Sequence, residues 1–401
     1  MKKSASSNQS TTNISFPIVG IGASAGGIEA VTQLLKNLSP NTGMAFVYIQ
    51  HLDPTHESKL SAILGRATSM EVLEAKDDMR IEPNHVYIIP PNKSLSLVDG
   101  ALVLDQRKPR PTVHLPIDQF FISLAEVYRE SAIGVLLSGN ASDGALGLKA
   151  IKMAGGITIA QDDSARFKGM PKSAIAEGIV DMVMPPDEIA HELEHLSLKS
   201  AVIRSIADMD DDSSDGANED LASILQLLKK STGVDFTHYK IKTIKRRIIR
   251  RMLLYKLDTL HDYVQYLRQH ATEVNMLYQD LLINVTSFFR DPDAMEYLKK
   301  SLFPSILKNK APNDPLRIWV PACSTGEEAY SIAMLFMEIL GDKISGIPIQ
   351  IFATDLSEVA IAKARLGLYT RNDMAEVSPR RLERFFTKVD GSYRIIKSIR
   401  D

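Results

Sequence analysis

The sequence predicts a doubly wound, mainly parallel α/β domain, followed by a small all-α domain and an incomplete α/β domain. Three observations indicate this fold class. Short β-branched runs alternate with amphipathic helical stretches over residues 16–197, only helical apolar spacing occurs over residues 221–295, and strand and helix patterns alternate again over residues 296–401. The length of 401 residues also favours two or three domains, at roughly 150 residues for each domain.

The first region begins with the apolar strand FPIVGIGA and an amphipathic helix, and this pair then repeats along the chain. Strands are expected over residues 16–23, 44–50, 85–90, 132–139 and 155–161, with a hairpin over residues 94–104 that turns at Asp99-Gly100. Helices are expected over residues 28–38, 57–67, 117–130 and 145–155. Because strands that alternate with helices pair in parallel, we expect helices on both faces of one sheet.

The helical region and the last region are also predicted from the spacing of apolar residues that is typical of helices and of strands. Helices are expected over residues 221–230, 243–257, 260–270, 274–285, 327–340 and 357–369. Strands are expected over residues 316–323 and 349–355. Two strands and two helices cannot form a sheet with both faces covered. We therefore expect the last region to be the first part of a domain and the natural chain to continue beyond Asp401.

Two stretches lack the apolar residues that a core requires. Residues 1–15 contain two lysines but no apolar run, so we expect a disordered tail and not a signal peptide. Residues 198–220 are expected to form an acidic linker, because the segment 207–220 contains seven acids, no base and almost no apolar side chain.

Composition narrows the class of protein. Hydrophobic residues make up 44% and charged residues 24% of the chain, as in ordinary globular proteins. The formal net charge of −2 argues against general nucleic-acid binding. The single cysteine, Cys323, cannot form an internal disulfide or a cysteine-built zinc site, and we expect no metal. No apolar run approaches the roughly 18 residues of a membrane helix, so we expect a cytoplasmic protein without membrane insertion.

A loop of small residues, SAGG at 24–27, follows the first expected strand and precedes a helix. This context places Ser24 on a tight turn, as in enzymes that present a nucleophile there. The backbone amides of Ala25 and Gly26, at the start of the helix, could donate to an oxyanion. The same loop nearly matches a dinucleotide fingerprint, GxGxxA at 20–25, and taken alone it favours phosphate binding.

The ends of two other strands distinguish these alternatives. A dinucleotide site requires an acidic residue at the end of the second strand, where this chain has Gln50-His51. Asp143 follows a third strand, so Ser24, His51 and Asp143 are expected at the carboxyl edge of one parallel sheet. We therefore expect Ser24 to attack a substrate, His51 to take and return its proton, and Asp143 to orient the imidazole.

Over residues 16–197 the chain resembles the chemotaxis protein-glutamate methylesterases of the CheB type. The resemblance rests on GIGASAGGIEA at 20–30, IQHLDP at 49–54, HVYIIPPN at 85–92, GVLLSGNASDGALGLKAI at 134–151 and AQDDSARFKGMPKSAI at 160–175. It implies a catalytic triad of Ser24, His51 and Asp143. It also implies hydrolysis of glutamate methyl esters on receptor helices, with release of methanol, deamidation of receptor glutamines, and no cofactor.

Three features depart from the pattern of this family. Ala25 stands where the stand-alone enzymes typically have threonine, and Asn140 stands where they have methionine. Both positions belong to the expected oxyanion pocket. The stand-alone enzymes also carry an N-terminal receiver domain, whereas only residues 1–15 precede the first strand here, so we expect no control by an attached receiver.

A strongly basic segment, KIKTIKRRIIRRMLLYK at 240–256, contains eight bases and no acid. A solvated helix face is the simplest interpretation, and nucleic-acid binding is the usual alternative. Because the overall charge provides no extended basic footprint, an acidic protein surface is the better expected partner.

A second loop between a strand and a helix, ACSTGEE at 322–328, is followed by a strand that ends at Asp355. This carboxylate could hold a ribose diol. A single glycine is a poor dinucleotide fingerprint, and an acidic loop start repels phosphate. A cofactor with a positive centre and no phosphate, such as S-adenosylmethionine, meets both objections.

Over residues 221–401 the chain resembles the chemotaxis receptor methyltransferases of the CheR type, on NVTSFFRD at 284–291, ACSTGEEAYSIAM at 322–334 and FATDLSEVAIAKARLGLY at 352–369. The resemblance implies an incomplete Rossmann-like methyltransferase domain. The implied S-adenosylmethionine contacts are Asn284, Thr286, Arg290, one of Glu327 and Glu328, with Glu328 favoured, and Asp355. Roles in engaging acidic receptor helices are implied for Lys245, Arg246 and Arg250. Core positions are expected for Phe288, Phe289 and Cys323.

Together these patterns predict the N-terminal portion of a fused methylesterase and methyltransferase that acts on methyl-accepting chemoreceptor-like proteins. Fused members often continue into sensor and kinase domains, which are therefore possible partners in the same natural chain. We expect this chain to methylate poorly, because the later strands of the family lie beyond Asp401. The alternatives are a non-catalytic receptor-binding scaffold, disfavoured by the intact triad, and a dinucleotide-binding oxidoreductase, disfavoured by His51.

Overall fold

The computed structural model describes residues 16–51, 59–107, 115–207, 215–282, 286–308, 310, 314–341 and 348–400. The chain forms two compact units, Met1–Leu281 and Leu282–Asp401. The expected tail, residues 1–15, lies outside the described residues. Within the described part of the chain, no helix is both long enough and apolar enough to cross a membrane.

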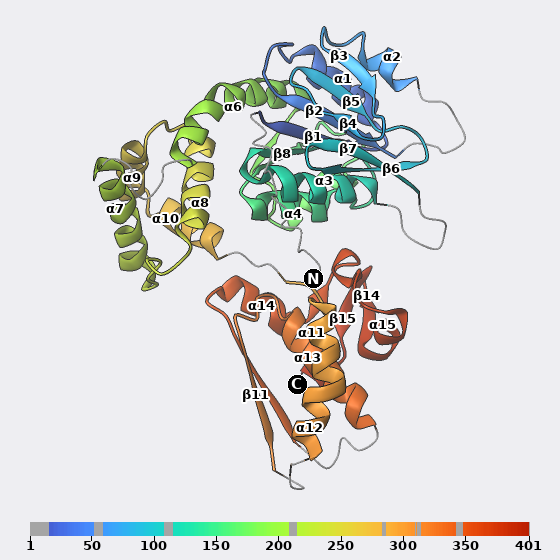
Figure 1. Ribbon diagram of the computed structural model, residues 1–401, viewed down its shortest axis with the longest axis vertical. Coiled ribbons are helices and arrows are strands. Elements are labelled where there is room, and N and C mark those ends of the chain that lie inside the picture. The colour runs from blue at the N-terminus through green and yellow to red at the C-terminus, as the bar shows by residue number, and fades with distance from the viewer. Residues whose placement is uncertain are drawn as a thin grey trace, which may run out of the picture. The chain divides into compact units, whose positions relative to one another are not determined.

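A seven-stranded parallel sheet is the centre of the first unit (Figure 1), which confirms the predicted α/β fold. Its strands are β1 (Ile18–Ala23), β2 (Ala45–Gln50), β3 (Glu71–Glu74), β5 (His85–Ile88), β8 (Ala132–Leu136), β9 (Ile157–Gln161) and β10 (Met182–Met184). They lie in the order β10-β9-β8-β1-β2-β5-β3. The order in which the chain adds strands to the sheet therefore reverses between β1 and β8. Open α/β sheets bind their ligands at such a point.

Helices cover the sheet in pairs, and each pair buries an apolar face. They are α1 (Gly27–Lys36), α2 (Leu60–Leu64), α3 (Pro116–Tyr128), α4 (Ala145–Ala154), α5 (Gly169–Ala176) and α6 (Pro186–Ala207), with a 3-10 turn, η1 (Arg129–Ser131). Helix α1 packs on α6, and α3 packs on α4. Phe120, Phe121 and Leu124 of α3 are completely buried against the sheet, so α3 is held firmly over the end of β1.

A small antiparallel sheet lies beside the parallel one and consists of β4 (Met79–Arg80), β6 (Lys93–Val98) and β7 (Ala101–Gln106). Strands β6 and β7 form the predicted hairpin. Its two-residue loop is Asp99-Gly100, and both residues have positive φ, 47° and 81°, as a tight turn of this kind requires. Strands β3, β4 and β10 were not predicted, because short segments with charged or partly exposed residues carry little periodic signal.

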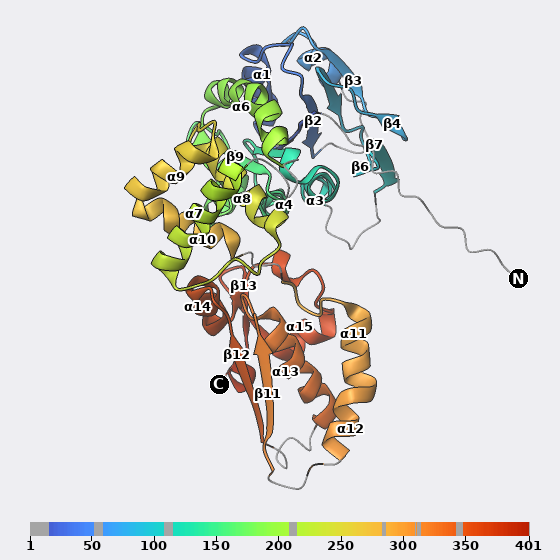
Figure 2. The ribbon, with the colours of Figure 1, turned by 60° about the vertical axis from the view of Figure 1, so that its left-hand side comes forward.

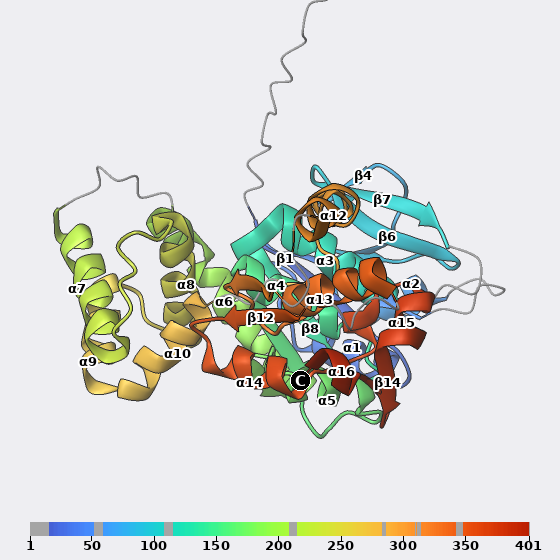
Figure 3. The same ribbon diagram turned by 90° about the horizontal axis from the view of Figure 1, so that it is seen from below.

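Four helices complete the first unit, as the sequence predicts, and form a bundle (Figure 3). They are α7 (Asp215–Thr232), α8 (Ile241–Leu254), α9 (Leu260–Gln269) and α10 (Ala271–Leu281). The expected linker, residues 198–220, is partly helical, since α6 runs to Ala207 and α7 begins at Asp215, whereas residues 208–214 lie outside the described residues. Acidic residues at a helix N-terminus are favoured by the helix dipole, which explains why the acidic end of this segment joins α7.

The second unit contains a parallel pair of strands, β11 (Leu316–Pro321) and β12 (Ile349–Thr354), and the long helix α13 (Glu327–Leu340) (Figure 2). The other helical segments are α11 (Pro292–Tyr297), the π-helical η2 (Leu298–Leu302), α12 (Phe303–Lys308), α14 (Glu358–Leu366), the 3-10 turn η4 (Asn372–Met374), α15 (Pro379–Phe385) and α16 (Lys397–Arg400). Segment 286–295, which the sequence analysis joined to the helical region, belongs to this unit.

One part of the second unit differs from the sequence prediction. The expected helix over residues 357–369 ends at Leu366, because Gly367 has a φ of 57° and reverses the chain. Leu368–Tyr369 is then strand β13, which forms an antiparallel sheet with β14 (Phe386–Val389) and β15 (Ser392–Ile395). The apolar side chains of Trp319 and Phe352, on β11 and β12, are 69% and 53% exposed.

Candidate active site

Ser24, the expected nucleophile, lies on the turn between β1 and α1. Its backbone amide donates to the Ser138 carbonyl at 2.9 Å, and its carbonyl accepts from the Gly27 amide at 2.9 Å. The turn depends on glycine at two positions. Gly26 has a φ of 71°, and a Cβ atom there would lie 2.7 Å from Ser138 Oγ, while a Cβ atom on Gly27 would lie 2.5 Å from Ala23 Cβ.

The sheet register places His51 next to this turn. Ala23 pairs with Gln50 at the ends of β1 and β2, so Ser24 and His51 directly follow two adjacent strands. The Ser24 Oγ and His51 Nδ1 atoms are 3.1 Å apart. On the other side of the ring, His51 Nε2 lies 2.9 Å from Asp143 Oδ2. The structure therefore brings the three predicted residues together in one chain of contacts.

The direction of these contacts assigns the histidine tautomer. A carboxylate only accepts hydrogen bonds, so Asp143 requires the proton on Nε2 of His51, and Nδ1 is then free to accept the Ser24 hydroxyl. The two ring nitrogens have exchanged their roles relative to the serine-protease template, where Nε2 faces the serine. The chemistry is unchanged, since either nitrogen can act as the base when the other is held by a carboxylate.

Asp143 is well placed to remain an anion. Its side chain is 1% exposed, and besides His51 it accepts from two backbone amides, those of Ile117 at 3.1 Å and Asp118 at 2.9 Å. Both amides belong to the first turn of α3, where N–H groups lack partners within the helix and the helix dipole favours negative charge. A buried carboxylate with three donors is stabilised in its charged form.

The expected oxyanion donors also lie at a helix N-terminus. Helix α1 begins at Gly27, so the amides of Ala25 and Gly26 precede its first turn. Asn140, the second position that departs from the family's pattern, is exposed and follows β8 at the same edge of the sheet. A further histidine, His85, lies at the opposite end of its strand, where Nδ1 contacts the Pro83 carbonyl at 2.8 Å.

Sequence reasoning missed a second acidic residue at this site. Asp118 is 3% exposed and lies one residue after Ile117, in the same helical turn that holds Asp143. Burial raises the pKa of Asp118 to about 8, and the neighbouring charge of Asp143 acts in the same direction. An aspartate at a helix start looks like an ordinary N-terminal acid in the sequence, so no local signal identified it.

The second candidate site is the turn between β11 and α13. The Ser324 amide donates to Asp355 Oδ2 at 2.8 Å, and the Ser357 amide donates to Asp355 Oδ1 at 2.8 Å, so the carboxylate at the end of β12 is held beside the loop. Glu327 is buried and accepts from Thr325 Oγ1, whereas Glu328 is exposed. Burial also raises the pKa of Glu327. Of the two predicted glutamates, Glu328 is the one that can meet a ligand.

The remaining predicted cofactor contacts lie on the segment before α11. Thr286 is partly buried and Arg290 is exposed, while Asn284 lies outside the described residues. Phe288 and Phe289 are buried, as predicted, and the Phe289 amide donates to Ser331 Oγ of α13 at 3.0 Å. A pocket of about 380 Å³ next to the loop is lined by Cys323, Gly326, Tyr330, several aliphatic residues and the two arginines Arg365 and Arg400, and by none of the predicted cofactor contacts.

Cys323 is buried, as predicted, and burial raises the pKa of its thiol. Such a thiol is a poor nucleophile. Among the described residues, no group of histidine, cysteine and acidic side chains has the arrangement of a metal site.

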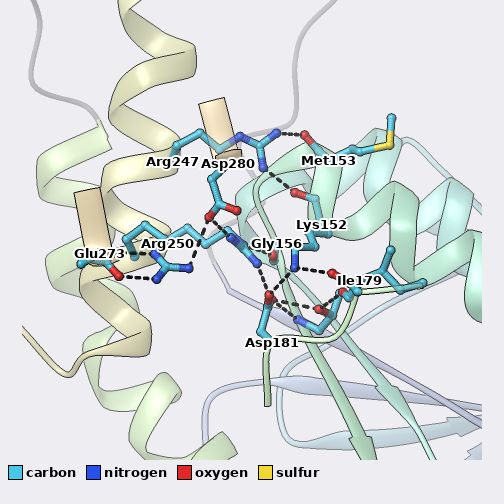
Figure 4. A network of polar contacts seen from close by, with 12 residues as sticks. Lys152, Met153, Gly156, Ile179, Asp181, Arg247, Arg250, Glu273 and Asp280 are labelled. Atoms are coloured by element: carbon cyan, nitrogen blue, oxygen red, sulfur yellow. Dashed lines mark hydrogen bonds and ion pairs between the residues drawn. The ribbon is translucent and has the colours of Figure 1, made fainter. Parts of the chain in front are cut away.

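The basic helix α8 does not present its arginines as expected. Arg250 is 1% exposed, and its guanidinium bridges Asp181 and Asp280, while Arg247 donates to the carbonyls of Lys152 and Met153 (Figure 4). The implied contact of Arg250 with a receptor is therefore contradicted. Arg247 and Arg250 thus point toward the end of α4 and the start of β10, where the buried Asp181 carboxylate and backbone carbonyls accept their hydrogen bonds.

Two neighbouring bases on α8 are less deeply placed. Arg246 forms an ion pair with Glu130 at 3.2 Å, and both side chains are partly exposed. Lys245 is partly buried. Lys242, near the start of the same helix, is exposed.

Three family models match successive parts of the chain. A family model described as "CheB methylesterase" matches residues 19–193. Two others, "CheR methyltransferase, all-alpha domain" and "CheR methyltransferase, SAM binding domain", match residues 219–282 and 284–401.

Relatives show the same division. The "Uncharacterized 104.1 kDa protein in hypE 3'region" of Rhodobacter capsulatus is 35% identical over 360 residues, which cover 85% of this chain and 38% of that protein. "Protein-glutamate methylesterase/protein-glutamine glutaminase 2" of Burkholderia pseudomallei is 37% identical over 179 residues, 44% of this chain and 52% of that protein. The chain thus spans about half or less of the length of these two relatives.

A solved structure matches the first part of the chain. The crystal structure of the Thermotoga maritima CheB methylesterase catalytic domain is 33% identical in sequence and covers 46% of this chain and 100% of that one, with a TM-score of 0.43. The chain thus combines a first part that matches the CheB methylesterase family with a second part that matches the all-alpha and SAM-binding domains of the CheR methyltransferase family.

Proposed function

We propose that this chain hydrolyses glutamate methyl esters in proteins through Ser24, His51 and Asp143. The observation that carries the proposal is the continuous contact from Ser24 Oγ through the His51 ring to Asp143, at 3.1 Å and 2.9 Å. The substrates would be methyl-accepting chemoreceptor-like proteins, and the setting would be sensory adaptation in the cytoplasm. The named relatives of the first part are methylesterases that also act as protein-glutamine glutaminases, so deamidation of glutamine belongs to the same proposal.

The proposed reaction gives each step to one group. Ser24 Oγ attacks the ester carbonyl while His51 Nδ1 takes the hydroxyl proton, and the carbonyl oxygen becomes an oxyanion that faces the amides of Ala25 and Gly26. The resulting imidazolium is stabilised by Asp143. The bond between the carbonyl carbon and the methoxy oxygen then breaks, and His51 gives its proton to the methoxide, which leaves as methanol. The glutamyl group stays on Ser24 Oγ as an acyl-enzyme. Water, deprotonated by the same histidine, releases the free glutamate and regenerates the serine.

For the second part we propose that Asn284, Thr286, Arg290, Glu328 and Asp355 hold S-adenosylmethionine, which would supply the methyl group. The residues present fit such a group. The Asp355 carboxylate is fixed by two amides yet partly exposed, and the Ser324 hydroxyl beside it is buried without a hydrogen-bond partner. Acidic residues around the loop suit a cofactor with a positive centre and no phosphate.

The proposal is tested by methanol release from a methylated receptor fragment. We compare the wild-type chain with Ser24→Ala and His51→Ala, and with His85→Ala as a matched control, because His85 lies at the other end of the sheet. All variants are first checked by circular dichroism and thermal unfolding. Release that vanishes in Ser24→Ala and His51→Ala but persists in His85→Ala supports the esterase.

The alternative is a non-catalytic scaffold that binds receptors through enzyme-like domains. Folded wild-type protein that releases no methanol from several methylated receptors, yet binds them, would favour the scaffold. Equal release by wild type and Ser24→Ala would show that another group performs the chemistry.

A further inference from the structure

A second buried carboxyl group lies directly behind the proposed triad. Asp118 Oδ1 accepts from the Gly147 amide at 2.7 Å, and its other oxygen, Oδ2, is buried with no donor in contact. The backbone amide of the same residue donates to Asp143 at 2.9 Å. Asp118 is therefore attached to Asp143 through its main chain, while one of its side-chain oxygens has no donor.

Two glycines allow this close approach of α3 to the turn that carries Asp143. A Cβ atom on Gly147 would lie 2.4 Å from Phe121 Cβ and 3.1 Å from Asp118 Cα, and one on Gly144 would lie 2.9 Å from Ile117 Cγ2. Gly144 also has a φ of 93°. Larger residues would push the first turn of α3 away, so the two aspartates are juxtaposed by tight packing and not by a surface coincidence.

Two carboxyl groups can share a hydrogen bond only if one of them carries a proton. Asp143 has three donors, the two amides of α3 and His51 Nε2–H, which favour its anion. Asp118 has fewer donors, and burial together with the Asp143 charge raises its pKa to about 8. The proton therefore belongs on Asp118, and its orphaned oxygen becomes a donor toward Asp143.

We propose that Asp118 is a positioning residue of the esterase, whose neutral carboxyl group donates a hydrogen bond to Asp143 and holds that carboxylate toward His51. This inference rests on the proposed function of the triad. While Asp118 stays neutral, the site carries one buried negative charge. When Asp118 ionises, the donated bond is lost and two carboxylates repel each other behind His51.

The groups that face Asp118 limit what could titrate with it. From the β8–α4 turn the facing charge is Asp143, and beyond it, at the end of β2, is His51. Helix α4 contributes the backbone amides of Gly147 and Gly144. In the described part of the site no cation opposes the two carboxylates, so the alkaline transition we expect belongs to Asp118.

The test compares Asp118→Asn and Asp118→Ala in the full chain, with methanol release measured between pH 6 and 9.5 and the rate of Ser24→Ala subtracted at each pH. Asparagine keeps the acceptor for Gly147 and supplies a donor that does not titrate. We expect wild-type kcat/KM to fall as pH rises through about 8, Asp118→Asn to lose this fall while retaining near wild-type activity at pH 7, and Asp118→Ala to lower kcat about 10- to 100-fold with little change in KM.

Three results would overturn the proposal. An unchanged alkaline limb in Asp118→Asn would assign that limb to another group. Equal loss of activity in both variants would show that an ionised carboxylate is needed, and wild-type kcat in Asp118→Ala would show no positioning role. Thermal unfolding separates these outcomes from simple loss of the fold.

One readout does not depend on activity, and it separates this inference from the proposed function. The carboxyl ¹³C shift of Asp118, assigned by its disappearance in Asp118→Asn, should titrate with a midpoint near pH 8 in the folded chain. A midpoint below about 5, in the ordinary range of carboxyl groups, would overturn the inference even if methanol is released. If the midpoint lies near pH 8 but the chain releases no methanol, Asp118 is protonated as inferred and the proposed esterase activity is rejected.

Discussion

Two turns in this chain each join a strand to a helix through a Ser-x-Gly sequence, and different chemistry is proposed for each. Their backbones differ at the serine, since Ser324 has a φ of 51° whereas Ser24 has no positive φ. Ser24-Ala25-Gly26 joins β1 to α1, and Ser324-Thr325-Gly326 joins β11 to α13. In both turns the glycine has positive φ, 71° and 97°, and caps the start of the helix. Each serine amide is fixed by a neighbouring strand end, to the Ser138 carbonyl in the first turn and to Asp355 in the second.

The side chains make the difference. Ser24 is partly buried, and its Oγ atom lies 3.1 Å from Nδ1 of His51, which follows the adjacent strand β2. Ser324 Oγ is buried without a partner, and the adjacent strand β12 ends in Asp355. Both turns present small residues at the start of a helix. Under the proposed functions, the residue that follows the neighbouring strand, His51 or Asp355, decides between nucleophilic catalysis and cofactor binding.

The largest expected effect separates the two serines. Ser24→Ala should lower methanol release by about 10⁴-fold or more, because the nucleophile is lost. Ser324→Ala should leave methanol release unchanged, since its hydroxyl takes no part in that site. Steady-state kinetics on both purified variants measures this. A comparable loss in Ser324→Ala would show that the two turns do not act separately.

The next largest effect concerns the stability of the first unit. Arg250→Met should reduce the free energy of unfolding by about 3–5 kcal/mol, because it leaves Asp181 and Asp280 buried without their cation. Urea unfolding, followed by loss of methanol release, measures the change. The control is Lys242→Met, an exposed base on the same helix, which should stay within about 0.5 kcal/mol of wild type. Equal unfolding midpoints for the two variants would contradict the prediction that the buried Arg250 stabilises the first unit.

The second turn is tested by ligand binding. Asp355→Asn should weaken S-adenosylmethionine binding about 10- to 100-fold, because a charged acceptor is replaced by a neutral amide. Isothermal titration calorimetry on the full chain measures the dissociation constant. Glu358→Gln removes an exposed charge at the start of α14 and should bind like wild type. Unchanged affinity in Asp355→Asn would remove that residue from the cofactor site.

The smallest expected effect tests the positive-φ glycine that both turns have at the helix N-cap. Gly26→Ala and Gly326→Ala should each destabilise their turn by about 1–2 kcal/mol from positive φ alone, with more from the contacts that the added Cβ would make with Ser138 and Ala364. Gly178→Ala is the matched control, since Gly178 has a φ of 68° and open space around it. Thermal unfolding that shows the same cost at all three positions would mean that packing adds nothing to the two turns.

The sequence predicted much of the first unit and of its site. Alternation of strand and helix patterns identified the parallel sheet, and the register of β1 against β2 then places Ser24 beside His51. The prediction was weaker where elements are short or depend on distant partners. Strands β3 and β10, the sheet formed by β13, β14 and β15, and the helical ends of the acidic segment 198–220 were all missed.

What the sequence by itself determined is the set of elements and the residues that end each strand, because periodicity, glycine turns and strand ends are local properties. Only the tertiary structure decided that Asp118 lies behind Asp143, 25 residues away along the chain, and that Arg250 is buried against Asp181, 69 residues away. Both contacts involve ionisable residues that look solvent-exposed in the sequence. They become buried because packing brings partners to them, and a buried charge is stable only where such partners exist.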